Sequence, residues 1–295
     1  MAEIEKEHHA VIIATTGRPA VLRQTIDSLS KQTSPPSQII VVYAKEGDID
    51  SNLSYREGLE VIRGRPGLTT QRNDGIDALE ARVQLVTFID DDIELSEHYL
   101  FNCREFFKGH PKVAAANGEL LADGKITRED AKRLLCETKS SLPPISEHRP
   151  SRGLYGCNMT FRRKVLEKER FDERLRLWAY LEDFDIGIRS RRHGETVAIP
   201  ACVAVHLAEP SGRISYRRRG FSQIMNSAYL VRKGVIPRRE FWRVHIFMSM
   251  IRSNLIGTLV KSDHRARWEG FIGNTIAMSL ILRNRIEPEL AEQIK

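Results

Sequence analysis

Four short runs of almost entirely apolar residues constrain the fold of the first hundred residues more than any other feature. They lie at 9–15, 38–43, 59–62 and 85–89, with helix-like segments between them. Strands without alternation of apolar and polar residues are buried on both faces, which is typical of a parallel sheet covered by helices. The sequence therefore predicts an α/β fold with a mostly parallel sheet flanked by helices.

Two helices are expected between these runs, over 19–30 and 70–81. Pro19 suits the start of the first, because the N–H that proline lacks would be unpaired in a first turn. In parallel sheets, ligands bind beyond the carboxyl ends of the strands. The loops 15–18 and 43–48 both fall at that edge, which is where we expect a site.

Three consecutive carboxylates, Asp90, Asp91 and Asp92, follow the last run directly. Oxygen ligands suit a hard cation, Mg²⁺ or Mn²⁺, that bridges to substrate phosphates. On an extended chain Asp90 and Asp92 point to one side and Asp91 to the other. The alternative is a helix start, where acidic residues are favoured.

A second acidic cluster, Glu182, Asp183 and Asp185, lies among apolar and aromatic residues. Burial raises the pKa of a carboxyl group and makes its carboxylate a better base. On a helix Glu182 and Asp185 share a face, and Asp183 points elsewhere. The alternative is a salt-bridged helix, because two arginines follow at pairing distance.

His206 and Arg72 are single candidates. His206 ends a predicted strand over 196–205, where it could bind Mn²⁺ or serve as a hydrogen-bonded structural residue. Arg72 lies near the carboxyl edge of the sheet, where it could face a diphosphate or simply belong to a helix cap. The phosphate-binding patterns GxGxxG and GxxxxGK[ST] are missing, which disfavours a Rossmann dinucleotide site and a P-loop.

In chain order these pieces resemble the family 2 glycosyltransferases, which have the GT-A fold. The resemblance covers roughly residues 9–235. It rests on Thr15-Thr16-Gly17-Arg18, Arg72-Asn73-x-Gly75, Asp90-Asp91-Asp92, the segment GCNMTFR at 156–162, Glu182-Asp183 and the strand end at His206.

The resemblance implies a metal-dependent, inverting glycosyltransferase. It would move a sugar from a nucleotide diphosphate sugar, a UDP-sugar being favoured, to a hydroxyl of a glycan or lipid-linked acceptor. Asp183 would be the general base, and Glu182 would help to place the acceptor. Asp92 and His206 would bind the divalent cation, Mn²⁺ or Mg²⁺, and Arg72 would lie beside the nucleotide.

On the donor side, the resemblance implies that Asp90, with Asp91 beside it, contacts the nucleoside and ribose. Thr15 and Arg18 would border the nucleobase. The family commonly has an aspartate at the end of its second strand that reads the base, and Tyr43 stands at that place here. The identity of the nucleobase therefore stays open.

Four segments follow from this interpretation. We expect a nucleotide-sugar-binding half over 1–119 and an acceptor-binding half with the catalytic base over 153–210. Residues 120–152, rich in Ser, Pro and Arg toward their end, are expected to form a linker or lid. Residues 211–295 are expected to be a helical, basic C-terminal extension.

The extension has 16 Lys and Arg against 6 Asp and Glu, whereas 1–210 has 30 against 33. Such a charge favours an anionic partner. One interpretation is an interfacial helix on an anionic membrane surface, and the other is a helix packed on the catalytic domain or a second subunit, which leaves an oligomer open. We expect its apolar stripe at Phe241, Val244, Met248, Ile251, Leu255 and Leu259.

The sequence predicts a cytoplasmic chain, either soluble or peripheral on the inner face of the membrane. The N-terminal MAEIEKEHHA is too acidic and polar for a secretory signal. The apolar stretch 244–260 is interrupted by Arg252 and Asn254 and is too polar for a membrane span. Four scattered cysteines without a CxxC pair argue against a zinc ribbon and a disulfide framework, and indicate a reducing compartment.

Two alternative functions fit parts of the sequence. A non-catalytic nucleic-acid or polysaccharide-binding module would use the basic tail, but few aromatic residues lie among its cations, and no nucleic-acid partner is expected. A sugar nucleotidyltransferase shares the sheet and the acidic metal site. It normally begins with a Gly-rich basic loop, which residues 14–19 do not supply.

Overall fold

The computed structural model describes residues 8–50, 53, 58–124, 126–209, 214–260 and 262–295. They group into two compact units. Unit 1 contains the described residues of Met1–Pro66, Thr70–Arg170 and Ile186–Gly212. Unit 2 contains those of Gly67–Thr69, Phe171–Asp185 and Arg213–Lys295.

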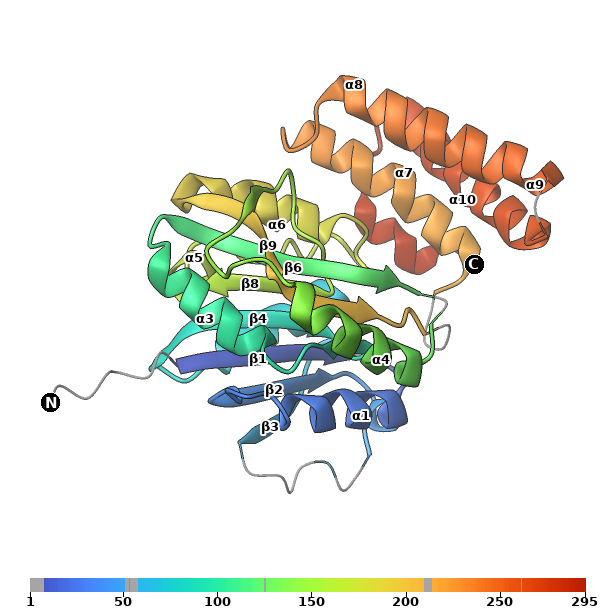
Figure 1. Cartoon of the computed structure of the whole chain (residues 1–295). Helices are drawn as coiled ribbons and strands as arrows, with labels where there is room; N and C mark the ends of the chain where they lie inside the picture. Colours follow the sequence, from blue (N-terminus) through green and yellow to red (C-terminus); the bar gives the residue numbers. More distant parts are fainter. Residues whose placement is uncertain (1–7, 51–52, 54–57, 125, 210–213, 261) are drawn as a thin grey trace, which may run out of the picture. The chain divides into compact units, whose positions relative to one another are not determined.

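Unit 1 is built on a nine-stranded sheet flanked by helices (Figure 1). The strand order is β3-β2-β1-β4-β8-β6-β9-β5, and β7 pairs with β9. The strands are β1 (His8–Thr15), β2 (Gln38–Tyr43), β3 (Leu59–Arg63), β4 (Val83–Asp90), β5 (Ile93–Leu95), β6 (Val113–Asp123), β7 (Arg149–Pro150), β8 (Asn158–Arg162) and β9 (Glu195–His206).

The sheet is parallel in its first half and mixed in its second. Strands β1 to β4 pair in parallel, as the four apolar runs predicted. Strand β8 runs antiparallel to both β4 and β6, and β5 and β7 run antiparallel to β9. Apolar runs report burial on both faces but carry no information on direction, so the reversed strands were not foreseen.

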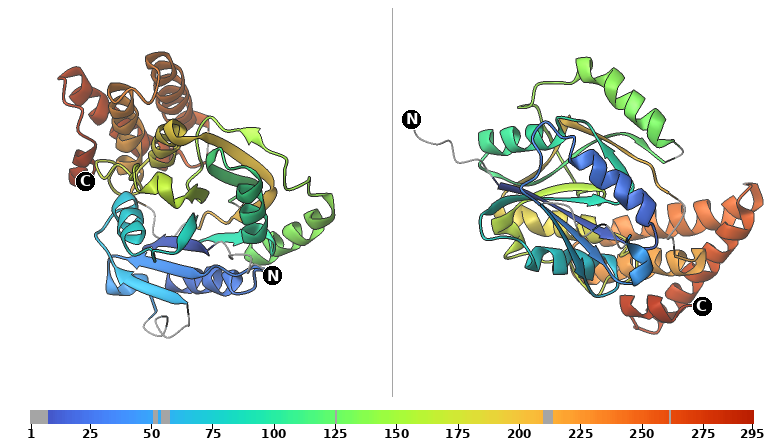
Figure 2. Two further views of the ribbon diagram at one scale, coloured as in Figure 1. Left: turned by 90° about the vertical axis from the view of Figure 1, so that its left-hand side faces the viewer. Right: turned by 90° about the horizontal axis from the view of Figure 1, so that it is seen from below.

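Helices cover both faces of the sheet. Val11 and Ile13 of β1 belong to the core cluster that includes residues of α1 and α3. Ile12 faces the other way, because side chains alternate along a strand. On that side lies α2, where a Cβ atom on Gly75 would be 2.6 Å from Ile12 Cγ2 (Figure 2). The helices up to β9 are α1 (Pro19–Leu29), α2 (Leu68–Asp77), α3 (Tyr99–Gly109), α4 (Arg128–Thr138), α5 (Arg163–Leu166) and α6 (Glu182–Ser190), with short 3-10 turns η1 (Glu46–Asp48), η3 (Lys139–Ser141) and η4 (Arg191–His193).

The expected linker or lid over 120–152 contains regular structure. Strand β6 continues to Asp123, which lies at the carboxyl edge of the sheet, and α4 follows. Thr127 caps α4, as its hydroxyl oxygen accepts a hydrogen bond from the backbone N–H of Asp130 at 3.1 Å. The boundaries proposed for the four segments stay predictions.

A close approach of β6 and β9 gives a prediction for stability. A Cβ atom on Gly118 would lie 2.2 Å from the carbonyl oxygen of Cys202, so backbone would have to move. We expect Gly118→Ala to lower the free energy of unfolding by about 1–3 kcal/mol, measured by urea denaturation. Gly109→Ala is the control, because Gly109 is exposed at the end of α3 and its Cβ would meet no heavy atom within 4 Å. Equal stability of the two variants would contradict the close approach.

Unit 2 is helical from α7 onward, as predicted for the extension. Its α7 and α10 pack so closely that a Cβ atom on Gly220 would be only 2.0 Å from the carbonyl oxygen of Gly270. Asn274 Nδ2 donates a hydrogen bond to the Gly220 carbonyl at 2.7 Å. The elements are α7 (Tyr216–Arg232), α8 (Arg238–Glu240), η5 (Phe241–Ile256), α9 (Gly257–Val260), α10 (His264–Leu282) and η6 (Pro288–Gln293).

The predicted apolar stripe on the helix that follows Phe241 is wrong in detail. Element η5 is a π-helix, whose hydrogen bonds span five residues, so its period exceeds the assumed 3.6. Phe241 and His245 are buried, whereas Met248 is 39% exposed and Leu259 beyond η5 is 83% exposed. In the part of the chain that the structure describes, no helix has both the length and the apolarity needed to span a membrane.

Candidate active site

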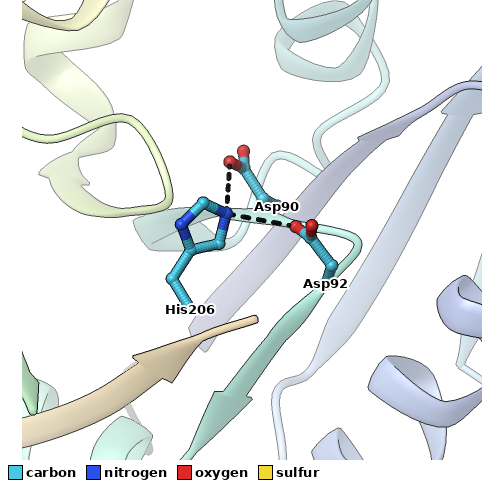
Figure 3. A group of neighbouring side chains, drawn as sticks. All are labelled: Asp90, Asp92 and His206. Atoms are coloured by element: carbon cyan, nitrogen blue, oxygen red, sulfur yellow. Dashed lines mark ion pairs between the residues drawn. The ribbon is translucent and has the colours of Figure 1, made fainter. Parts of the chain in front are cut away.

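Asp90, Asp92 and His206 lie together at the carboxyl edge of the sheet (Figure 3). His206 Nε2 is 3.3 Å from Asp92 Oδ1 and 3.7 Å from Asp90 Oδ2. One potential ligand atom from each residue lies within 4.8 Å of the others. The predicted gathering of Asp90 and Asp92 with His206 is therefore present.

The turn between β4 and β5 brings these residues together. Strands β4 and β9 are not neighbours, because β8 and β6 lie between them. The chain leaves β4 at Asp90 and enters β5, where Ile93 pairs with His206 of β9. The backbone N–H of Leu207 then donates to the carbonyl oxygen of Asp92 at 2.9 Å. The acidic triplet thus spans the sheet edge from β4 to β9.

Asp91, the middle residue of the triplet, is fully buried. Its carboxylate accepts a hydrogen bond from Thr15 Oγ1 at 2.6 Å and pairs with Arg18 Nη2 at 2.5 Å. Burial raises the pKa of Asp91 to about 7, an effect that Arg18 and Thr15 only partly offset. In the structure Asp91 therefore ties the loop after β1 to the triplet.

Arg18 also holds Asp92. Its Nη1 is 2.8 Å from Asp92 Oδ2, which accepts a second hydrogen bond from the backbone N–H of Glu209 at 2.8 Å. Burial alone would raise the pKa of Asp92, but the hydrogen bond from His206 and the charge of Arg18 outweigh it and lower that pKa. Asp92 is thus an ionised, oriented carboxylate with Oδ1 toward His206.

His206 is the cationic partner of this acidic site. Burial would lower its pKa, but the hydrogen bonds to Asp92 and Asp123 and the charges of Asp90 and Asp92 raise it to about 9. Its second ring nitrogen, Nδ1, lies 2.7 Å from Asp123 Oδ1. Sequence reasoning missed Asp123, because a single aspartate in an expected linker gives no signal until β6 is known to end there.

Two side chains of α2 connect strand ends at this edge. Arg72 is buried, and its Nη2 lies 3.2 Å from Asp90 Oδ1 and donates to the Gly156 carbonyl at 2.8 Å. Gln71 Nε2 donates to backbone carbonyls at the ends of β1 and β2 at 2.9 and 2.8 Å. Arg72 therefore orients Asp90 in this structure.

Asp48 lies shortly after the end of β2, the place where the family commonly has an aspartate that reads the base. It is buried, and its carboxylate accepts hydrogen bonds from the backbone N–H groups of Gly17 at 2.7 Å, Ala44 at 3.1 Å and Lys45 at 2.7 Å. These bonds link the loops after β1 and β2. Thr15 and Arg18 belong to the same loop system, and their predicted contact with a nucleobase stays a prediction.

Glu182 and Asp183 begin α6 and belong to unit 2. Acidic residues are stabilised at a helix N-terminus by the helix dipole. Glu182 is buried, and Asp183 Oδ1 accepts a hydrogen bond from the backbone N–H of Phe184 at 2.7 Å. That these two residues act together with the Asp90, Asp92 and His206 group stays a prediction.

The segment that leads into α6 has a strained backbone. Three non-glycine residues adopt left-handed φ angles, at a cost of order 1–3 kcal/mol each, and such strain clusters at functional sites. Between them, Trp178 and Tyr180 stack with ring centroids 5.3 Å apart, and Arg219 lies 5.1 Å from the Trp178 ring centroid. The strained residues are Leu177 (φ 62°), Ala179 (φ 53°) and Leu181 (φ 69°).

The donor atoms at the sheet edge fit a divalent cation. Two carboxylates and one imidazole form a ligand set that Mn²⁺ accepts. Apart from His206 Nε2, which lies 3.3 Å away, Asp92 Oδ1 is buried without a hydrogen-bond partner among the described residues. An atom in that state is suited to coordinate a cation.

Comparison with known proteins identifies the family. A model of glycosyl transferase family 2 matches residues 10–170, more than half of the chain. The chain belongs to this family. It is a glycosyltransferase with the GT-A fold, as predicted, and this result favours glycosyl transfer over the two alternative functions.

Two solved structures are similar in fold. One is GalNAc-T7 with UDP, GalNAc and Mn²⁺, at a TM-score of 0.56 and 15% identity over 86% of this chain and 58% of that chain. The other is residues 1–349 of TarS from S. aureus, at a TM-score of 0.56 and 15% identity over 97% of this chain and 87% of that chain. A comparison with curated proteins gave no match.

Proposed function

We propose that this glycosyltransferase moves a sugar from a nucleotide diphosphate sugar, with UDP-sugars favoured, to a hydroxyl of a glycan or lipid-linked acceptor. The reaction inverts the anomeric carbon and serves polysaccharide or glycolipid synthesis. The observation that carries the proposal is the meeting of Asp90, Asp92 and His206 at the sheet edge of a family 2 chain. The presence of UDP and Mn²⁺ in GalNAc-T7 adds support for the donor and for a cation.

Asp92 and His206 would hold a divalent cation, Mn²⁺ or Mg²⁺, through Oδ1 and Nε2. When bound, the cation supplies positive charge that offsets the charge on the departing diphosphate. Arg18 keeps Asp92 ionised and oriented, and Arg72 orients Asp90 toward the nucleoside and ribose. Asp91 positions the loop after β1 in place of the nucleoside contact expected from the sequence, because its carboxylate is buried on Thr15 and Arg18.

Asp183 is proposed as the general base. It accepts the proton of the acceptor hydroxyl as that oxygen attacks the anomeric carbon from the face opposite the diphosphate. An alcohol is a very weak acid, so a positioned base contributes mainly at the transition state. Glu182 helps to place the acceptor. The strained segment 177–181 supports a functional role for this stretch.

Donor binding is tested by a thermal-shift panel of UDP-, GDP- and dTDP-sugars with and without Mn²⁺. We expect one nucleotide class to raise the melting temperature, and to do so more strongly with Mn²⁺, because only the folded state binds. Turnover should release a nucleoside diphosphate. Release of pyrophosphate would instead identify a nucleotidyltransferase, and no shift with any donor would contradict the proposal.

The pKa of His206 predicts how cation binding depends on pH. A cation binds the neutral imidazole, so it must displace a proton while the pH is below about 9. We expect the apparent Mn²⁺ affinity to rise by up to about tenfold per pH unit between pH 6.5 and about 9. Electron paramagnetic resonance of free Mn²⁺ would measure it. An affinity that does not change over this range would contradict a role for His206 as a ligand.

The same pKa fixes the sign of a stability effect in the metal-free protein. Protonated His206 is stabilised by its carboxylate partners in the folded state only. The contribution of this interaction to the free energy of unfolding is fully present below the ordinary pKa of 6.5. It is lost as the pH rises to about 9. Metal-free protein should therefore melt at a lower temperature at the upper end of this range, and added Mn²⁺ should reverse the loss.

We also propose that η5 and its C-terminal continuation bind an anionic membrane surface, which would suit a lipid-linked acceptor. Trp242 and Phe247 are each 59% exposed, Leu259 is 83% exposed, and Arg243 and Arg252 are exposed beside them. Aromatic and apolar side chains interleaved with arginines are typical of interfacial helices. Sedimentation with anionic liposomes at low and high salt tests the proposal, and absence of binding at low salt would refute it.

A further inference from the structure

The ends of β6 and β9 place one further acidic residue against the candidate metal site. The two strands are parallel, and their last residues, Asp123 and His206, are paired in register. The backbone N–H of Gly124 donates to the His206 carbonyl oxygen at 2.7 Å, which closes the pair. The position of Asp123 relative to the imidazole is therefore set by the sheet.

Both oxygens of the Asp123 carboxylate have partners. Oδ1 lies 2.7 Å from His206 Nδ1, and Oδ2 accepts a hydrogen bond from the hydroxyl of Tyr155 at 2.8 Å. The other ring nitrogen, Nε2, faces Asp90 and Asp92. Asp123 is thus bound to the side of the imidazole that is turned away from the two carboxylates of the candidate metal site.

The chemistry of imidazole gives this arrangement a consequence. A neutral imidazole carries its proton on one nitrogen only, and the hydrogen bond made by that nitrogen decides which one it is. A carboxylate can only accept a hydrogen bond, so a neutral His206 paired with Asp123 keeps its proton on Nδ1. The lone pair is then on Nε2, the atom that faces Asp90 and Asp92. Metal-bound histidines commonly have such a partner, which raises the basicity of the ligand.

We propose that Asp123 is a positioning residue for the cation site, which orients His206 and holds its proton on Nδ1. Tyr155 in turn orients the Asp123 carboxylate. The inference rests on the proposed function, because it requires a cation at Asp92 and His206. It adds a residue from β6 to a site whose other members come from the β4–β5 turn and β9.

The test is Mn²⁺ binding to the full chain without nucleotide, followed by electron paramagnetic resonance. We expect Asp123→Ala to weaken Mn²⁺ affinity about 10–100-fold, the range typical for loss of such a partner. Asp123→Asn keeps a side-chain oxygen that can accept the Nδ1–H bond, so it should bind Mn²⁺ more tightly than Asp123→Ala. That rescue separates hydrogen bonding from loss of charge.

Glu119 supplies matched controls on the same strand. It pairs with Arg149 and has a 41% exposed side chain, against 50% for Asp123, so Glu119→Ala and Glu119→Gln should bind Mn²⁺ like the wild type. Circular dichroism and melting temperature check folding, and Asp123→Asn carries the test if Asp123→Ala does not fold.

Three outcomes would overturn the inference. Wild-type affinity in Asp123→Ala would show that the contact does not act on the cation site. Equal losses of Mn²⁺ affinity in Asp123→Ala and Asp123→Asn would show that only the charge of Asp123 matters. Absence of Mn²⁺ binding by the wild type would also remove the metal site from the proposed function. The first two outcomes, by contrast, would leave the metal site in place and exclude only the role of Asp123.

Discussion

Asp183→Asn is expected to lower kcat by about 10²–10⁴-fold, the contribution typical of a general base. The amide has the shape of the carboxylate but cannot accept the proton of the acceptor hydroxyl. Donor binding should be nearly unchanged, because the proposed contacts to the nucleotide come from the sheet edge. Steady-state kinetics together with nucleoside diphosphate affinity from calorimetry would measure both effects.

The control for this substitution is Asp77→Asn. Asp77 ends α2 and has a 64% exposed side chain paired with Arg170, outside the proposed site. It should retain wild-type kcat, which excludes a general effect of removing one carboxylate charge. Comparable turnover in Asp183→Asn and Asp77→Asn would remove Asp183 from the role of base.

Asp92→Asn is expected to abolish tight Mn²⁺ binding and to lower kcat by on the order of 10²–10³-fold. That is the range seen when one electrostatic contact to a developing charge is lost. The amide oxygen can still accept the hydrogen bond from the Glu209 N–H, and Arg18 keeps Asp91 as a partner, so the loop should retain its structure. Electron paramagnetic resonance of free Mn²⁺ measures the affinity, and steady-state kinetics at saturating Mn²⁺ measure kcat.

Two results would speak against this role of Asp92. An unchanged Mn²⁺ affinity would show that Asp92 is not a ligand, whatever the rate. A melting temperature far below that of Asp77→Asn would attribute the loss to folding instead. Near-normal melting with weak Mn²⁺ binding is the result that the geometry of Asp92 Oδ1 predicts.

The cation site and the proposed base were found in the sequence by different signals. Asp90, Asp91 and Asp92 come at the end of a buried strand, and alternation on an extended chain predicted that Asp91 points away from the other two. In the structure Asp91 and Asp92 lie in a turn, and both pair with Arg18. Glu182 and Asp183 stood out as carboxylates among apolar and aromatic residues, and the family resemblance implied their roles. Their place at the start of α6 agrees with the dipole preference of acidic residues. The pairing of their functions awaits the kinetic tests above.

Local patterns in the sequence determined the elements of this protein. The apolar composition of the first four strands reflects their burial on both faces, and Pro19 marks the start of α1. The order of motifs was enough to identify the family. The same reasoning misplaced the packed face of η5, because the 3.6-residue period does not hold in a π-helix. Local periodicity reports which side chains are buried, provided that the backbone geometry is the one assumed.

Tertiary structure alone decided which distant residues meet. The pairing of β5 with β9 brings Asp92 to His206, and the register of β6 with β9 brings Asp123 to the other side of the same ring. Arg18 and Arg72 turned out to hold the acidic residues, a choice of partner that no spacing along the chain encodes. Strand order and register arise from packing of the whole sheet, so contacts between strand ends become visible only once the fold is known.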